Sequence, residues 1–131
     1  MLFRSDAVPI AAYALVQQAR RARAPMSRDG LEHAIAMTRE ALEIAPEYVD
    51  AWTELAYANW LMWDIRYDPA PARREAAEAA SARAVELDPR LSDARYLLAA
   101  LYRQMGDRAA AERELEVFAV LETIPEGKSG Y

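Results

Sequence analysis

The sequence has no cysteine, one histidine, one lysine and only four glycines. The lack of cysteine excludes disulfide bonds, thiolate metal sites and cysteine nucleophiles. His33 has no second histidine to form a helical zinc pair, and no serine lies in a sequence typical of a nucleophile elbow. A glycine-rich phosphate-binding loop is also missing. These absences favour a protein that is not an enzyme and that needs no metal and no cofactor.

Long apolar runs are absent as well. No segment approaches the roughly 20 apolar residues of a membrane-spanning helix, and the first residues lack the basic and apolar regions of a signal peptide. Residues 31–131 carry 19 acidic side chains against 11 basic ones. Such an acidic chain argues against general nucleic-acid binding, because phosphate contacts require an excess of cations. We therefore expect a cytoplasmic protein that binds neither nucleic acid nor membrane.

The residues that are abundant, such as alanine, leucine, glutamate and arginine, are good helix formers. Apolar periodicity and helix-ending residues predict an all-α chain without strands. Pro9 is expected in the first turn of the first helix, Ser27 caps the second, and Asp68 and Pro69 begin the fourth. Gly106 is expected to end the fifth helix in a left-handed conformation. The predicted helices span residues 7–23, 28–44, 49–63, 69–87, 92–105 and 108–122.

One short pattern occurs twice in the chain. Residues 41–46 read Ala-Leu-Glu-Ile-Ala-Pro and residues 84–89 read Ala-Val-Glu-Leu-Asp-Pro, and in both cases Asp-Ala follows four residues later. Every matching position is offset by 43 residues. Repetition at this period indicates copies of one helical unit that stack on each other, because a single unit buries only part of its apolar face.

Six helices in three antiparallel pairs resemble the tetratricopeptide repeat family. Its motif of 34 residues places tryptophan, leucine, a small residue and tyrosine on the first helix of a pair, and alanine, a bulky residue, alanine and proline on and after the second. The middle unit matches with Trp52, Leu55, Ala56, Asn59, Ala77, Ser81, Ala84 and Pro89. The last unit matches with Arg95, Leu98, Ala99, Tyr102, Ala111, Leu115 and Phe118, and the first with Ala34, Thr38, Ala41 and Pro46.

The chain departs from this motif in three ways. Asn59 replaces the usual tyrosine, Arg95 replaces the usual tryptophan, and the middle unit has about nine extra residues between positions 60 and 72. The resemblance implies a right-handed superhelix of three units at about 7–46, 47–89 and 90–122, a single domain that covers residues 7–122. Residues 123–131 are expected to form a flexible tail. A weaker resemblance is to the repeats that are appended to bacterial cyclases and winged-helix regulators.

The resemblance also implies a concave groove lined by the first helix of each unit. The positions that would face it are Tyr13, Arg20, Thr53, Tyr57, Trp60, Tyr96 and Arg103. We expect a scaffold that holds a peptide or protein segment there, with aromatic rings against an apolar side chain and Arg103 against a carboxylate. The lysine that some members use to clamp a peptide carboxylate is missing, since Lys128 is the only lysine.

Two alternatives stay open at this point. The same helical stack could carry a small enzyme or a small-molecule site, which a closed pocket with convergent titratable groups would favour. Trp60 and Trp63 could instead cover the lengthened middle unit as local core.

The last helix carries a second apolar stripe, formed by Val117, Leu121 and Ile124. Repeat arrays usually cover such a final face with a capping helix. We expect this stripe to form a homodimer or to contact the remainder of a longer chain. Alternatively, Pro125 turns the tail back so that Tyr131 covers part of the stripe.

Overall fold

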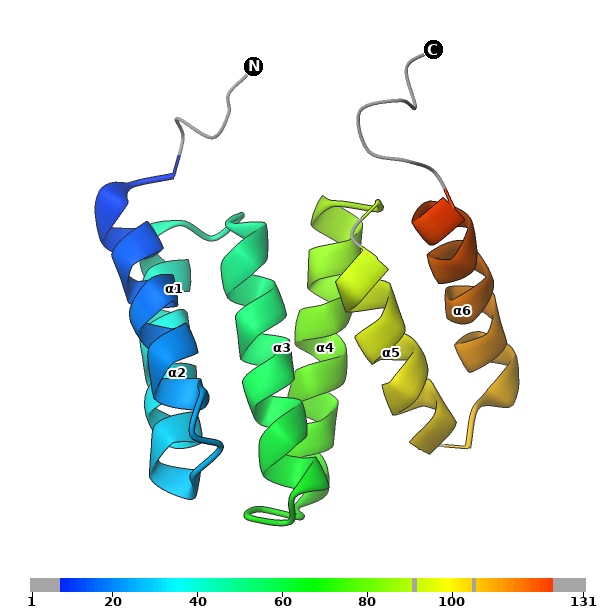
Figure 1. Cartoon of the computed structure of the whole chain (residues 1–131), viewed down its shortest axis with the longest axis horizontal. Coiled ribbons are helices and arrows are strands. Elements are labelled where there is room, and N and C mark those ends of the chain that lie inside the picture. Colours follow the sequence, from blue (N-terminus) through cyan, green and yellow to red (C-terminus); the bar gives the residue numbers. More distant parts are fainter. Residues whose placement is uncertain (1–7, 91, 105, 124–131) are drawn as a thin grey trace.

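The computed structural model describes residues 8–90, 92–104 and 106–123 (Figure 1), and this part of the chain forms six α-helices and no strand. The described part of the chain is therefore all-α, as predicted. The helices are α1 (Ile10–Arg23), α2 (Arg28–Ile44), α3 (Val49–Asp64), α4 (Pro71–Leu87), α5 (Ser92–Gln104) and α6 (Arg108–Thr123).

Two predicted helix starts are wrong, and proline explains both. α1 begins at Ile10, because Pro9 has an extended backbone (φ −61°, ψ 146°) and precedes the helix as its N-cap. α4 begins two residues later than predicted, at Pro71, with Ala70 extended at ψ 140°. A residue before proline is disfavoured in the helical region, so Ala70 cannot be part of the helix. Asp68 Oδ1 accepts the N–H of Ala70 at 3.2 Å and does not cap the helix.

Other predicted helix ends are confirmed. The hydroxyl of Ser27 accepts a 3.0 Å hydrogen bond from the N–H of Gly30 and caps α2. Gly106 has φ 84°, the left-handed conformation expected after α5. α6 extends one residue further than predicted, to Thr123.

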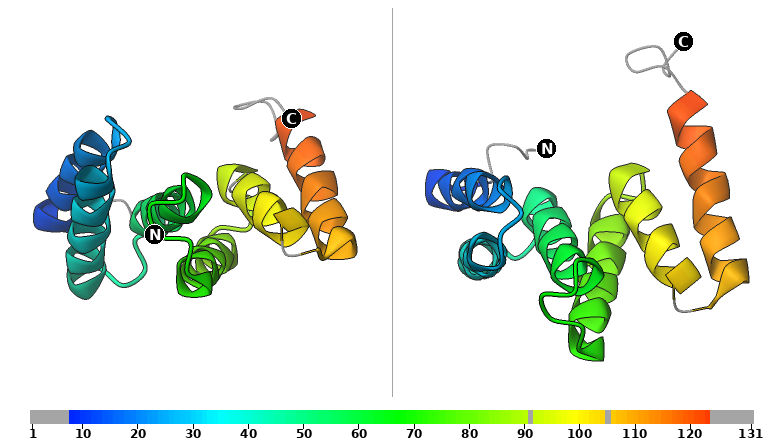
Figure 2. Two further views of the ribbon diagram at one scale, coloured as in Figure 1. Left: turned by 90° about the horizontal axis from the view of Figure 1, so that it is seen from below. Right: turned by 60° about the horizontal axis from the view of Figure 1, so that its bottom comes forward.

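The helices follow one another in a row. Each contacts the next one along the chain, most closely within α1–α2, α3–α4 and α5–α6, and α1 also contacts α3. Figures 1 and 2 show α1 and α6 towards opposite ends of this row. Small side chains let the helices approach closely. The main core cluster combines Ala19, Ala34, Ala56, Ala58, Ala77 and Ala80 with Leu31, Leu61, Met62 and Leu101.

The 43-residue sequence repeat is also a repeat of local structure. The residue after α2, Ala45, has φ −137° and ψ 85°, and the residue after α4, Asp88, has φ −139° and ψ 89°. On the same two helices the buried hydroxyls of Thr38 and Ser81 each bond to the carbonyl four residues earlier. The two segments therefore have the same backbone conformation at the turn and an equivalent side-chain hydrogen bond inside the helix.

Candidate functional site

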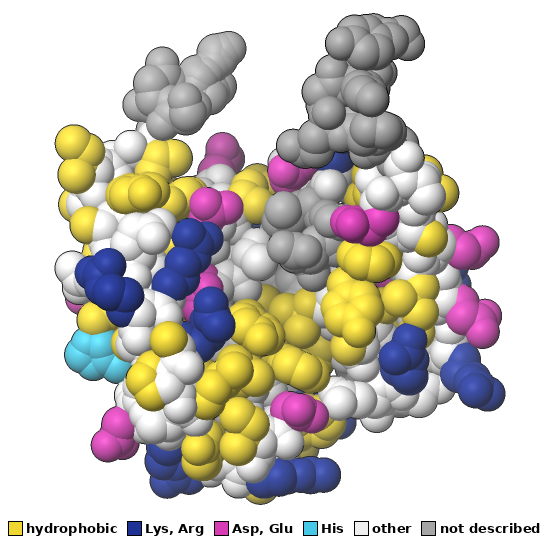
Figure 3. Space-filling model, viewed as in Figure 1, with side chains coloured by type: hydrophobic (Ala, Val, Ile, Leu, Met, Phe, Trp, Pro, Cys, Tyr) yellow, Lys and Arg dark blue, Asp and Glu magenta, His cyan; other side chains and the backbone are white. Residues whose placement is uncertain are grey.

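A groove of about 590 Å³ lies between four helices. Its walls come from α1, α3, α5 and α6, and its lining residues are Arg20, Arg23, Thr53, Glu54, Tyr57, Trp60, Tyr96, Leu97, Ala100 and Phe118. Figure 3 shows the hollow in the middle of this face, with hydrophobic side chains inside it and basic side chains over α1. The groove thus combines an apolar surface with a cationic edge.

Five of the seven predicted groove residues line this cavity, namely Arg20, Thr53, Tyr57, Trp60 and Tyr96. Tyr13 and Arg103 do not, and both are exposed elsewhere on α1 and α5. Tyr13 lies seven residues before Arg20, about 10 Å along the axis of α1, and Arg103 lies three residues after Ala100, about 4.5 Å along the axis of α5. The groove is therefore shorter than the predicted face.

The charged and aromatic lining residues that the prediction missed are Arg23, Glu54 and Phe118. Glu54 is almost fully buried, with 4% of the residue exposed. Its main partner is Arg23, 31 positions earlier in the chain. A contact between residues so far apart leaves no periodic signal in the sequence, so only the packing of α1 against α3 reveals it.

Ion pairs fix the cationic edge. Arg23 binds the Glu54 carboxylate with two nitrogens, through Nε and through Nη2 at 3.3 Å. Arg20 Nε lies 3.8 Å from Glu54 Oε1, and Arg20 Nη2 lies 3.8 Å from Asp50 Oδ2. The Arg20 side chain is 41% exposed. The Arg20 side chain is therefore partly accessible to an anionic group in the groove, whereas the Glu54 carboxylate is buried in its ion pairs.

Two pairs of aromatic rings form the apolar surface. Tyr57 and Trp60 stack on α3, with ring centres 6.1 Å apart and an interplanar angle of 14°. Tyr96 and Phe118 contact each other across α5 and α6, with ring centres 5.3 Å apart and an angle of 46°. The Arg23 guanidinium lies 4.6 Å from the Tyr57 ring centre. A cation therefore already covers one face of this ring.

Trp60 and Trp63 have different surroundings. Trp60 lines the groove, and its Nε1 donates a 3.3 Å hydrogen bond to Gln104 Oε1 of α5. Trp63 is not a lining residue. Its ring lies 5.7 Å from the guanidinium carbon of Arg66 and 5.8 Å from that of Arg74. Trp63 thus packs against side chains of the α3–α4 connection and of α4.

The outer face of α6 differs from the predicted stripe. Val117 and Val120 are exposed, at 37% and 57%. Leu121 is half-buried, and Ile124 lies outside the described residues. Leu121 follows Phe118 by three positions and Glu114 by seven, and all three are half-buried, so they share a partly covered face. The large apolar residues that are exposed on the described part of α6 are the two valines.

His33 is exposed on α2. Within the described part of the chain no three His, Cys, Asp or Glu side chains gather as a metal site would require. No helix in these residues has the length and apolar character needed to cross a membrane. In comparisons with known proteins, the chain matches no family model and no curated sequence.

Proposed function

We propose that this protein is a non-enzymatic scaffold that holds a peptide or protein segment of a partner in the groove between α1, α3, α5 and α6. The observation that carries the proposal is that five residues chosen for one binding face meet in one cavity. Tyrosine and tryptophan are frequent energetic anchors of protein interfaces. Arg20 offers its exposed guanidinium to a carboxylate of the partner, the role that the sequence suggested for Arg103.

The proposed architecture is a tetratricopeptide-like right-handed superhelix of three helix pairs, with a lengthened middle pair. The matching turns after α2 and α4 support it. The close packing within α1–α2, α3–α4 and α5–α6 supports it as well. A cytoplasmic location belongs to the same proposal, since a chain without cysteine suits a reducing compartment.

The rival function is a small helical enzyme or a small-molecule site in the same groove. Acid–base chemistry needs a titratable group that is free to exchange a proton with a substrate. Among the residues that line the groove, Glu54 is the one carboxylate. Its ion pairs with Arg23 and Arg20 occupy it. This arrangement favours binding over catalysis.

Two tyrosines offer a matched test of the groove. Tyr96 and Tyr13 are 55% and 54% exposed, but only Tyr96 lines the groove. We expect Tyr96→Ala and Trp60→Ala to reduce capture of the partner from cell extract at least fivefold, measured by quantitative mass spectrometry. Tyr13→Ala is expected to capture as much as the wild type. Equal capture by all four proteins would refute the groove as the binding site.

We also propose that α6 pairs with a second copy of the chain. Val117 and Val120 are exposed on its outer face. Exposed apolar groups of this kind on a terminal helix are typical of an interaction surface.

A further inference from the structure

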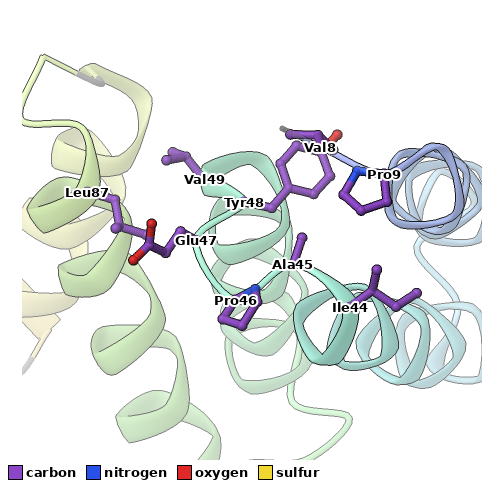
Figure 4. Close-up of a pocket in the computed structure, with 9 residues that line it drawn as sticks. All are labelled: Val8, Pro9, Ile44, Ala45, Pro46, Glu47, Tyr48, Val49 and Leu87. Carbon is purple, nitrogen blue, oxygen red and sulfur yellow. The ribbon is translucent and has the colours of Figure 1, made fainter. Parts of the chain in front are cut away.

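A second hollow lies at one edge of the helix row, where α1 and α3 begin and α2 and α4 end. Its volume is about 740 Å³, and it is here called the end pocket. Figure 4 shows its lining, most of which is apolar and includes Val8, Pro9, Ile44, Pro46 and Leu87. The Glu47 side chain extends from the turn before α3 toward Leu87 of α4. The sequence alone did not indicate this pocket, because its residues come from four separate helix ends.

One carboxylate, that of Glu47, lines the end pocket, and other acidic residues are close to it in sequence. Five acidic residues line it or directly adjoin a lining residue in sequence: Glu43, Glu47, Asp50, Glu86 and Asp88. No basic residue lines it or adjoins a lining residue among those described. Of the five carboxylates, Asp50 pairs with Arg20 and Glu86 pairs with Arg83. Within the described residues, Glu43 and Glu47 form no ion pair, and both are exposed.

The ends of α2 and α4 add to this negative potential. The last carbonyl groups of a helix lack partners within the helix, and they carry a partial negative charge. Basic residues in the last turn usually compensate this charge. Neither α2 nor α4 has a basic residue there. Two uncompensated helix ends therefore adjoin an apolar pocket that already carries the Glu47 carboxylate.

We propose that the end pocket binds a basic, partly apolar segment of a partner protein. The aliphatic stem of a lysine or arginine packs on Pro9, Ile44 and Leu87, while its charged head lies near Glu47 and the helix ends. Long basic side chains combine an apolar stem and a cation in this way. An anionic ligand is disfavoured here, because Glu47 is the one charged residue among those that line the pocket.

This inference is independent of the groove. The groove carries two arginines on its edge, whereas the one charged residue that lines the end pocket is Glu47. The two sites therefore select segments of opposite charge. A substitution in one is expected to leave binding at the other unchanged, so the two proposals can fail separately.

The test uses a fluorescent peptide of alternating leucine and arginine with blocked ends, and fluorescence anisotropy as the measurement. We expect Glu47→Lys to weaken its binding about tenfold, since it reverses the charge beside the bound cation. Glu116→Lys is the matched control, because Glu116 is exposed on α6 and the net charge changes equally. We expect the control to weaken binding less than twofold. Replacing leucine by serine in the peptide is expected to weaken binding as strongly as Glu47→Lys.

NMR locates the peptide on the protein. We expect it to shift the backbone amide signals of Val8, Ala45, Val49 and Leu87, and to leave that of Tyr96 unchanged. The proposal is overturned if the peptide does not bind, if both charge reversals weaken binding equally, or if the serine peptide binds as tightly. Shifts confined to the groove would also overturn it.

Discussion

The indole Nε1 of Trp52 donates a 2.8 Å hydrogen bond to the carbonyl oxygen of Pro46, six residues earlier. Forty-three positions further along, Arg95 Nε donates a 2.9 Å hydrogen bond to the carbonyl oxygen of Pro89. Tryptophan and arginine differ in size and charge, but both present an N–H group at the edge of a planar system. The two segments therefore contain an equivalent hydrogen bond from a helix side chain to the carbonyl of the preceding turn, although the donor residue differs.

Arg95 also pairs with Glu114 of α6, at 2.9 Å, and both side chains are less than 20% exposed. We expect Arg95→Met to lower the free energy of unfolding by about 1–3 kcal/mol, because it leaves a partly buried carboxylate without its cation. The matched control is Arg83→Met, which removes an exposed pair with Glu86 on one helix. We expect the control to cost less than about 0.5 kcal/mol. Urea denaturation measures both, and equal losses would contradict the prediction.

At position 30 we expect glycine to be more stabilising than alanine, the reverse of the usual order in a helix. Alanine normally stabilises a helix interior by about 1 kcal/mol relative to glycine. A Cβ atom at position 30 would lie closer than 3.0 Å to the carbonyl oxygen of Ala22 and to Ser27 Oγ. We therefore expect Gly30→Ala to destabilise the protein by about 1–3 kcal/mol, since the α1 backbone must move.

Gly106→Ala is a useful comparison for Gly30→Ala in the same thermal denaturation series. Among the described residues nothing lies within 4 Å of a Cβ at Gly106, but the φ of 84° at this position is unfavourable for alanine. We expect a loss of about 1 kcal/mol there, from backbone strain alone. A Gly30→Ala protein that is more stable than the wild type would show that α1 and α2 pack less closely than described.

The buried carboxylate of Glu54 lines the groove and also contributes to the stability of the folded chain. Its side chain is 5% exposed and contacts Arg23 and Arg20. We expect Glu54→Gln to lower the free energy of unfolding by about 1–3 kcal/mol, because the amide leaves Arg23 without a charged partner, while Arg20 keeps Asp50. The matched control is Asp50→Asn, which changes an exposed carboxylate on the same helix. Urea denaturation of the two variants should differ clearly, and similar values would contradict the assigned ion pair.

Asp68 provides a pH-dependent test of the turn before α4. A hydrogen bond from Arg73, and another from the backbone of Ala70, lower the pKa of its carboxyl below the ordinary value of 3.8. Its contribution to stability is therefore complete above pH 3.8 and is lost as the pH falls through the lower folded-state pKa. NMR titration of the carboxyl carbon measures this pKa directly. We expect Arg73→Gln to raise it and Arg83→Gln to leave it unchanged.

The proposed dimer depends on the exposed valines of α6. We expect the double substitution Val117→Glu/Val120→Glu to weaken self-association at least tenfold without unfolding the chain. Ala119→Glu, which changes an exposed residue on another face of α6, is expected to have no effect. Analytical ultracentrifugation over a range of concentrations measures both. A wild-type protein that stays monomeric throughout would contradict the dimer.

The sequence by itself determined the local features of this protein. α2 has the predicted bounds because a serine cap precedes it and a proline soon follows it. The predicted starts of α1 and α4 differ from the structure by three and two residues, because a proline can stand before a helix as well as inside its first turn. The 43-residue repeat predicted matching turns, and Ala45 and Asp88 have nearly the same backbone angles. All these features depend on neighbours within one or two helical turns.

The tertiary structure alone decided which side chains meet. Helical periodicity places Tyr57 and Trp60 on one face of α3, but it says nothing about how α1 and α6 are rotated toward that face. That rotation brings Arg23 onto Glu54 and Phe118 onto Tyr96, across 31 and 22 positions of the chain. It also leaves Tyr13 and Arg103 outside the groove. Such contacts arise from packing between helices, and the residue pattern within one helix carries no information about them.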